Sequence, residues 1–173
     1  MRHTLSILVE NRFGELARIV GLFSARGYNI ESLTVAETLD NQVSRVTLVT
    51  SGDDRTIEQI VKQVNKQVRV LSVTDLTPLE HIERELALIH VNARDADTQQ
   101  QLLNLVNIFH ARVIDVSESA LTIETTGNRA KVHALLRLLE PFGIQEMVRA
   151  GAVAIGKLPL ATRNGDINEA AVG

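Results

Sequence analysis

The chain has 173 residues, enough for one ordinary domain or two small ones. Hydrophobic residues make up 45% of it and charged residues 23%, proportions typical of globular domains that argue against a disordered chain. The net charge of -3 favours neither a nucleic-acid nor a membrane partner, and the absence of Cys excludes disulfides and a cysteine nucleophile. The sequence shows neither a signal-peptide pattern nor a transmembrane-length apolar run, so we expect a cytoplasmic protein.

The first half of the chain alternates between strand-like and helix-like patterns. Polar and apolar residues alternate near the N-terminus, as in a half-buried strand, and apolar residues between Leu16 and Phe23 then recur at helical spacing. Gly27 follows, where a left-handed helix cap is expected, and the acidic Asp53 favours the start of a second helix. The expected elements are strands at 3–10, 28–37, 42–50 and 68–76, with helices beginning at Gly14 and near Asp53.

The second half repeats this β-α-β-β-α-β order with an unlike sequence. The pattern predicts strands at 84–92, 111–116, 120–125 and 144–155, and helices with apolar stripes at 102–109 and 132–139. The fold class is therefore α+β, with two βαββαβ (ferredoxin-like) modules. The expected domains are 1–77 and 78–157, with a linker at 77–83 and a flexible tail at 158–173.

The catalytic and metal-binding patterns in the sequence are weak. Residues 151–157 have the Gly and Lys spacing of a phosphate-binding loop, but Leu158 and Pro159 follow instead of a hydroxyl residue and a helix. The five histidines are scattered, and no Ser stands in a nucleophile elbow, so we expect no catalytic residues and no metal site. An RNA-recognition module has the same element order, but the segment 42–50 lacks the aromatic residues on which bases stack.

One segment has features that suit a small zwitterionic ligand. Gly14 stands at the start of the first helix, where free N–H groups and the positive end of the helix dipole can receive a carboxylate. Asn11 lies in the preceding loop and Asn29 at the start of the next strand, and each amide offers both a donor and an acceptor. The segment therefore predicts an amino-acid site, although each residue also has an ordinary structural explanation.

These residues lie within a longer pattern. The chain resembles the ACT domain family of amino-acid sensors and, more closely, the regulatory (small) subunits of acetolactate synthase, also called acetohydroxyacid synthase. The resemblance covers nearly the whole chain except the tail. The stretches that carry it are Leu8–Asn11, Gly14, Leu16–Arg18, Gly21–Ser24, Arg26–Val35 (RGYNIESLTV, the most specific), Ile108–Phe109, Val113–Val116 and Arg149–Gly151.

The resemblance implies a homodimer in which two N-terminal ACT domains join their sheets and bind valine between them. Asn11 and Gly14 of one subunit would then face Asn29 and Ile30 of the other, with Leu16 nearby. It also implies a non-catalytic regulatory subunit that activates a large catalytic subunit and makes it sensitive to feedback inhibition by valine, in branched-chain amino acid biosynthesis. Thiamine diphosphate, FAD and magnesium are expected on that catalytic partner, and no cofactor on this chain.

Two other functional interpretations are compatible with the sequence alone, since a fold does not determine a function. One is a stand-alone ACT-type amino-acid sensor, and the other is a small enzyme on a ferredoxin-like fold. The preference among valine, leucine and isoleucine also stays open, because one methylene changes affinity only modestly in an apolar pocket.

Overall fold

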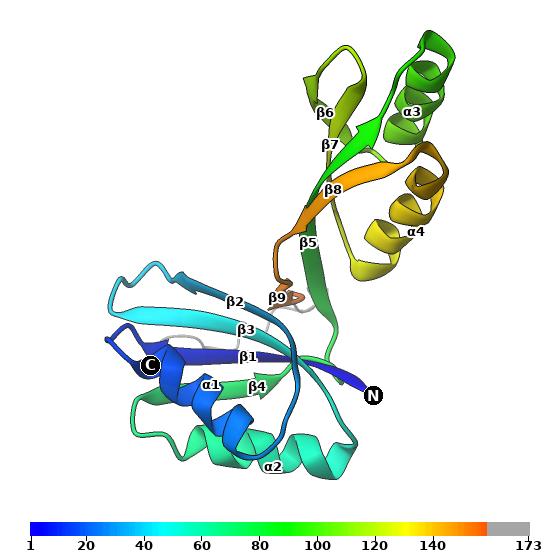
Figure 1. Ribbon diagram of the computed structural model, residues 1–173. Coiled ribbons are helices and arrows are strands. Elements are labelled where there is room, and N and C mark those ends of the chain that lie inside the picture. Colours follow the sequence, from blue (N-terminus) through cyan, green and yellow to red (C-terminus); the bar gives the residue numbers. More distant parts are fainter. Residues whose placement is uncertain (159–173) are drawn as a thin grey trace, which may run out of the picture.

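The computed structural model describes residues 1–158 and shows two modules joined by one long strand (Figure 1). The predicted tail lies outside the described residues except for Leu158. The first module contains β1 (Arg2–Glu10), α1 (Glu15–Ala25), β2 (Ile30–Glu37), β3 (Val43–Ser51), α2 (Asp54–Asn65) and β4 (Val70–Asp75). The second contains β5 (His81–Asn92), α3 (Ala96–Ile108), β6 (Arg112–Val116), β7 (Ala120–Gly127), α4 (Arg129–Leu139), the 3-10 turn η1 (Glu140–Phe142), β8 (Ile144–Arg149) and β9 (Val153–Gly156).

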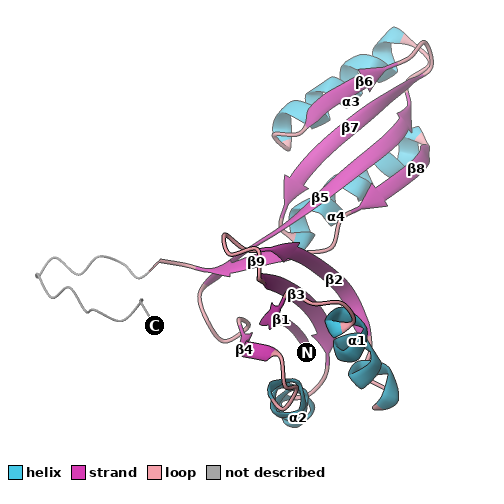
Figure 2. Cartoon of the chain, turned by 90° about the vertical axis from the view of Figure 1, so that its left-hand side faces the viewer, coloured by secondary structure: helices cyan, strands magenta, loops and turns pink. Residues whose placement is uncertain are grey.

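The strand order is β2-β3-β1-β4 in the first sheet and β6-β7-β5-β8 in the second, with every pairing antiparallel. In both views the two helices of each module cover one face of its sheet (Figures 1 and 2). These orders confirm the predicted α+β class with two ferredoxin-like modules. Strand β2 lies at an edge of the first sheet, so one side of its backbone has no strand beside it among residues 1–158.

Each module has its own apolar core, built by the periodicity of its strands and helices. In the first module, alternate residues of β1 and β3 face the stripes of α1 and α2. The buried set there is Leu5, Ile7, Val9, Ile19, Phe23, Val46, Leu48, Ile57, Ile60 and Val64. The second module buries Ala87, Ile89, Val91, Ala93, Leu102, Val106, Leu121, Ile123, Val132, Leu135 and Leu139.

Side chains cap three of the four α-helices in the described part of the chain. Asp53, Asp95 and Asn128 accept hydrogen bonds from the backbone N–H three residues later, at 2.7, 2.8 and 2.9 Å. Helix α1 differs, because the residue before it is Gly14, which has no side chain and adopts a left-handed φ of 86°. The predicted cap at Gly27 is confirmed by its φ of 68°, a conformation that glycine adopts readily.

The segment predicted as one strand at 144–155 is two strands. β8 ends at Arg149, and after a break around Gly151 the strand β9 pairs with the first residues of β5, from His81 to Arg84. The predicted linker at 77–83 therefore ends earlier, at Glu80, and β5 pairs with β9 before it enters the second sheet. Neither change could be read from local periodicity, since pairing between β5 and β9 is a long-range contact.

Candidate functional site

The loop between β1 and α1 is fastened to the β2–β3 hairpin by Asn11. Its Nδ2 donates to Glu37 Oε1 at 3.0 Å and to the Asn41 carbonyl at 2.9 Å, and its backbone N–H donates to the Gln42 carbonyl at 2.6 Å. A small open cavity of about 360 Å³ is lined by Asn11, Arg12, Glu37, Asn41 and Gln42. Within residues 1–158 both side-chain hydrogen bonds of Asn11 use Nδ2, so its amide oxygen can still accept one.

Gly14 follows this loop and stands at the N-terminus of α1. A Cβ at this position would have no atom of residues 1–158 within 4 Å, so there is space for a side chain here, although the left-handed φ disfavours residues other than glycine. Among the described residues no side chain caps α1 by a hydrogen bond, and the positive end of a helix dipole favours an anion. The neighbouring Leu16 was predicted in the apolar stripe of the helix, but 40% of it is exposed, so it can contact a ligand or a partner.

Sequence reasoning missed a buried carboxylate in this region. Glu15, the first residue of α1, is 3% exposed and lies 2.9 Å from Arg18 and 3.4 Å from Arg69. A lone carboxylate here would repel an anion at the helix terminus, but two guanidinium groups balance it. Spacing predicts the Glu15–Arg18 pair, since residues three apart share a helix face, whereas Arg69 comes from a distant segment.

Asn29 and Ile30 lie at the far end of α1, not beside Asn11 and Gly14. The Asn29 carbonyl accepts a hydrogen bond from Thr50 Oγ1 at 2.6 Å, and Ile30 begins β2 opposite Thr50. Because α1 has 11 residues, its ends are separated by about 16 Å. One chain therefore brings Asn11, Gly14 and Leu16 together and keeps Asn29 and Ile30 apart from them.

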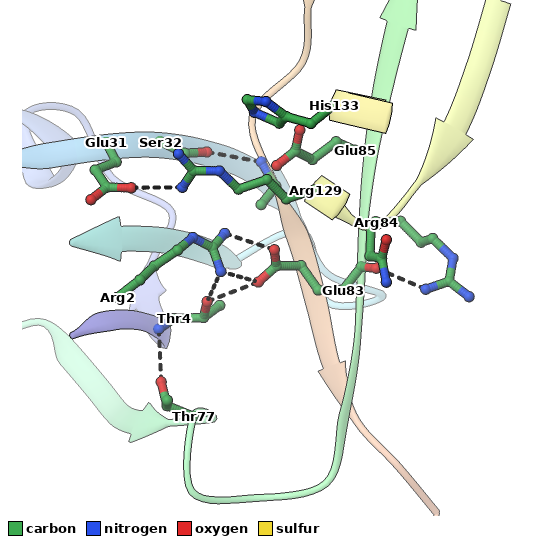
Figure 3. Close-up of polar contacts among 12 residues, drawn as sticks. Arg2, Thr4, Glu31, Ser32, Thr77, Glu83, Arg84, Glu85, Arg129 and His133 are labelled. Carbon is green, nitrogen blue, oxygen red and sulfur yellow. Dashed lines mark hydrogen bonds and ion pairs between the residues drawn. The ribbon is translucent and has the colours of Figure 1, made fainter. Parts of the chain in front are cut away.

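The first residues of β2 instead face the second module (Figure 3). Arg129 Nη1 lies 3.0 Å from Glu31 Oε2, and the Ala152 N–H donates to Ser32 Oγ at 2.8 Å. A cavity of about 570 Å³ opens at this junction, lined by Arg2, Glu31, Ser32, Leu33, Val49, Glu85, Arg129, Arg149, Ala150 and Gly151. A hydrogen bond from Ser51, and then Arg129, lowers the pKa of Glu31 despite partial desolvation, so the carboxylate is charged at neutral pH.

One further ion pair crosses the junction, and a second, within the second module, borders the cavity. Arg2 donates from Nη2 and Nη1 to Glu83 at 2.7 and 3.1 Å, and Arg149 pairs with the buried Glu85. Burial raises the pKa of Glu83, but hydrogen bonds from Arg2 and Thr4 outweigh it and hold the pKa below its ordinary value. The junction thus contains ion pairs beside a cavity. Polar contacts of this kind are typical of modules that can shift relative to each other.

The segment 151–157, which has the Gly and Lys spacing of a phosphate-binding loop, contains a strand. Val153–Gly156 form β9, and Ala152 and Ala154 are buried, which confirms that this segment is a strand. Within residues 1–158 no group of three or more metal-ligating side chains comes together. Over the same range no helix has the length and apolar character needed to cross a membrane.

The architecture thus defines the class: a protein of two ferredoxin-like modules, the first of them an ACT domain. Residues 5–72 match the family model described as AHAS small subunit-like ACT domain, and residues 84–158 match the model for the small subunit of acetolactate synthase. The chain belongs to the acetolactate synthase small-subunit family.

Named relatives agree with this assignment over most of their length. The chain is 50% identical to the acetolactate synthase small subunit of Mycobacterium bovis over 91% of this chain and 93% of that one. It is 46% identical to the Aquifex aeolicus small subunit, over 89% and 80% of the two chains. The crystal structure of the Thermotoga maritima small subunit superposes with a TM-score of 0.84 at 41% identity, covering 92% of this chain and 99% of that one.

Proposed function

We propose that this chain is the regulatory subunit of acetolactate synthase, which activates the large catalytic subunit and makes it sensitive to feedback inhibition by valine in the cytoplasm. The observation that carries the proposal is an ACT-type module whose relatives are named acetolactate synthase small subunits. In the proposal its candidate residues form two half-sites, Asn11, Gly14 and Leu16 at one end of α1 and Asn29 and Ile30 at the other. In this proposal the chain contributes no catalytic residue, and thiamine diphosphate, FAD and magnesium belong to the catalytic partner.

The effector site is completed by a second copy of the chain. If two β2 edges pair antiparallel about a two-fold axis, the Ile30 end of one strand lies near the Glu37 end of the other. Glu37 is tied to Asn11, so the Asn11 and Gly14 half of one subunit approaches the Asn29 and Ile30 half of its partner. This homodimer would satisfy the free backbone groups of β2.

The chemistry of the two halves fits valine. The carboxylate of the ligand is placed at the N-terminus of α1 beside Gly14, where the helix dipole and free N–H groups favour it. Side-chain oxygens of Asn11 and Asn29 accept hydrogen bonds from its ammonium group. Its isopropyl group packs against Leu16 and Ile30, and burying it contributes about 2 kcal/mol.

Inhibition then follows from linkage between valine binding and the state of the assembly. Valine can change the activity of the large subunit only if it binds one state of the complex more tightly than another. We assign residues 1–77 as the amino-acid-binding domain and 78–157 as a second domain, in keeping with the family matches at 5–72 and 84–158. Because two copies build each site, the ligand also strengthens the dimer.

The experiment is reconstitution of acetolactate formation from a purified large subunit with and without this chain. We expect the chain alone to form no acetolactate, to raise the activity of the large subunit when added, and to make that activity decrease on addition of valine. A chain that binds valine but leaves the large subunit unaffected would identify a stand-alone sensor. Acetolactate formed by the chain alone would identify an enzyme.

A further inference from the structure

Strand β2 contains a β-bulge immediately after Ile30. Ile30 is paired with Thr50 and Ser32 with Val49, so Glu31 is an extra residue with no opposite partner on β3. A bulge bends its strand and changes the direction of the neighbouring side chains. Its position next to Asn29 and Ile30 means that the geometry of the bulge sets where these two residues point.

The second module contacts this bulge and the residues just after it. Arg129, the first residue of α4, forms the 3.0 Å ion pair with the bulged Glu31 (Figure 3), and the Ala152 N–H donates to Ser32 Oγ at 2.8 Å. Gly151 lies so close to β2 that a Cβ on it would be 2.8 Å from the Leu33 carbonyl oxygen. The second module therefore holds the start of β2 through consecutive residues.

We propose that Arg129 is a positioning residue for the amino-acid site: together with Ser51 of β3 it holds the Glu31 carboxylate, and so fixes the bulge that orients Asn29 and Ile30. This inference rests on the proposed function and adds a route from that site to the second module. It assigns the position of Asn29 and Ile30 to control by the second module of the same chain, whereas Asn11 is held by the hairpin at the other end of β2.

The contact suits a coupling element because it can be made and broken. The Arg129 side chain is 48% exposed and borders the open junction cavity, so its pairing with Glu31 competes with hydration. When the pair is formed, the bulge is fixed in the geometry that binds valine. Since coupling is reciprocal, valine bound at Ile30 also favours the docked arrangement of the two modules.

The test is a charge exchange in the full chain. Valine affinity is measured by calorimetry for the wild type, Arg129→Glu, Glu31→Arg, the double variant Glu31→Arg/Arg129→Glu, and the control Arg112→Glu. The control breaks another Arg–Glu pair, Arg112–Glu124 at 2.6 Å, which lies within the second module and does not touch β2. Amide hydrogen exchange of residues 30–37 is measured on the same variants without valine.

We expect each single exchange to weaken valine binding roughly five-fold or more and to speed amide exchange at the start of β2. The double variant should bind more tightly than either single variant, and Arg112→Glu should match the wild type. Wild-type affinity in Arg129→Glu, or a double variant no better than the singles, would overturn the inference. A wild-type chain that binds no branched-chain amino acid would contradict the proposed function and not this inference. The amide exchange still tests the inference in that case, because unchanged exchange in Arg129→Glu would overturn the link between Arg129 and the bulge.

Discussion

Asn11 donates a hydrogen bond from Nδ2 to the Glu37 carboxylate 3.0 Å away and so ties the loop before α1 to the last residue of β2. The first residue of β2, Ile30, lies at the opposite end of the strand, next to the bulge that Arg129 holds. One edge strand thus carries a different part of the candidate site at each end. Under the proposed function, the site therefore depends on a second copy of the chain and on the second module.

Gly14 provides a test of the carboxylate position. Gly14→Asp should abolish valine inhibition in the reconstituted enzyme and leave activation by the subunit largely intact, because the added carboxylate repels that of valine. Gly14→Asn is the matched control, since Asn has a similar size and tolerates a left-handed φ about as well but has no charge. Equal valine inhibition in Gly14→Asp and the wild type would refute the placement of the ligand.

Gly151 should be necessary for docking of the two modules. Gly151→Ala places a Cβ against the Leu33 carbonyl oxygen and the Thr34 hydroxyl, so the free energy of unfolding should decrease by about 1–3 kcal/mol. Gly156→Ala, where a Cβ would have no atom of the described residues within 4 Å, should change it by less than about 0.5 kcal/mol. Urea unfolding measures both, and equal effects would show that the approach of Gly151 to β2 is unimportant.

Glu83 should make the free energy of unfolding depend on pH in the acid range. Its pKa is lowered in the folded chain, so its contribution is fully present above the ordinary value of 4.5 and is lost as the pH falls through the lowered folded pKa. Glu83→Gln should cost about 2 kcal/mol at neutral pH, because charge-assisted hydrogen bonds from Arg2 and Thr4 weaken. The difference between Glu83→Gln and the wild type in the free energy of unfolding, measured by urea unfolding, should shrink as the pH falls through the lowered folded pKa of Glu83. A difference that stays constant down to acid pH would contradict this assignment.

Helix α4 offers a comparison of one buried and one exposed leucine. Leu135 is fully buried in the second core, and Leu135→Ala should lower the free energy of unfolding by about 2–5 kcal/mol. Leu138 is 46% exposed on the same helix, and Leu138→Ala should cost less than about 1 kcal/mol. Similar costs for the two variants would mean that α4 does not pack as described.

Much of the fold could be predicted because its signals are local. The stripe that includes Ile19 and Phe23, the cap at Gly27 and the acidic start at Asp53 each lie within a few residues of the element that they define. The strand at 144–155 was predicted unbroken because its break depends on Gly151 meeting β2, more than a hundred residues earlier. Long-range pairing also hid the start of β5 at His81.

The candidate site was only partly accessible to sequence reasoning. Polar residue types and a glycine before a helix indicated Asn11, Gly14 and Asn29. No local pattern, however, predicts that residues at opposite ends of α1 contribute to one site across two subunits. The bulge at Glu31 was missed for the same reason, since a bulge is defined by pairing with β3. Its partner Arg129 lies in the other module.

The most direct test of the central claim, a valine site shared between two subunits, is complementation between half-site variants. Gly14→Asp and Asn29→Ala chains are each expected to lose valine binding, because every site in either homodimer lacks one half. Refolding them together should create mixed dimers with one intact site, so calorimetry should recover about a quarter of the wild-type binding sites. No recovery in the mixture, with mixed dimers present, would contradict a shared site.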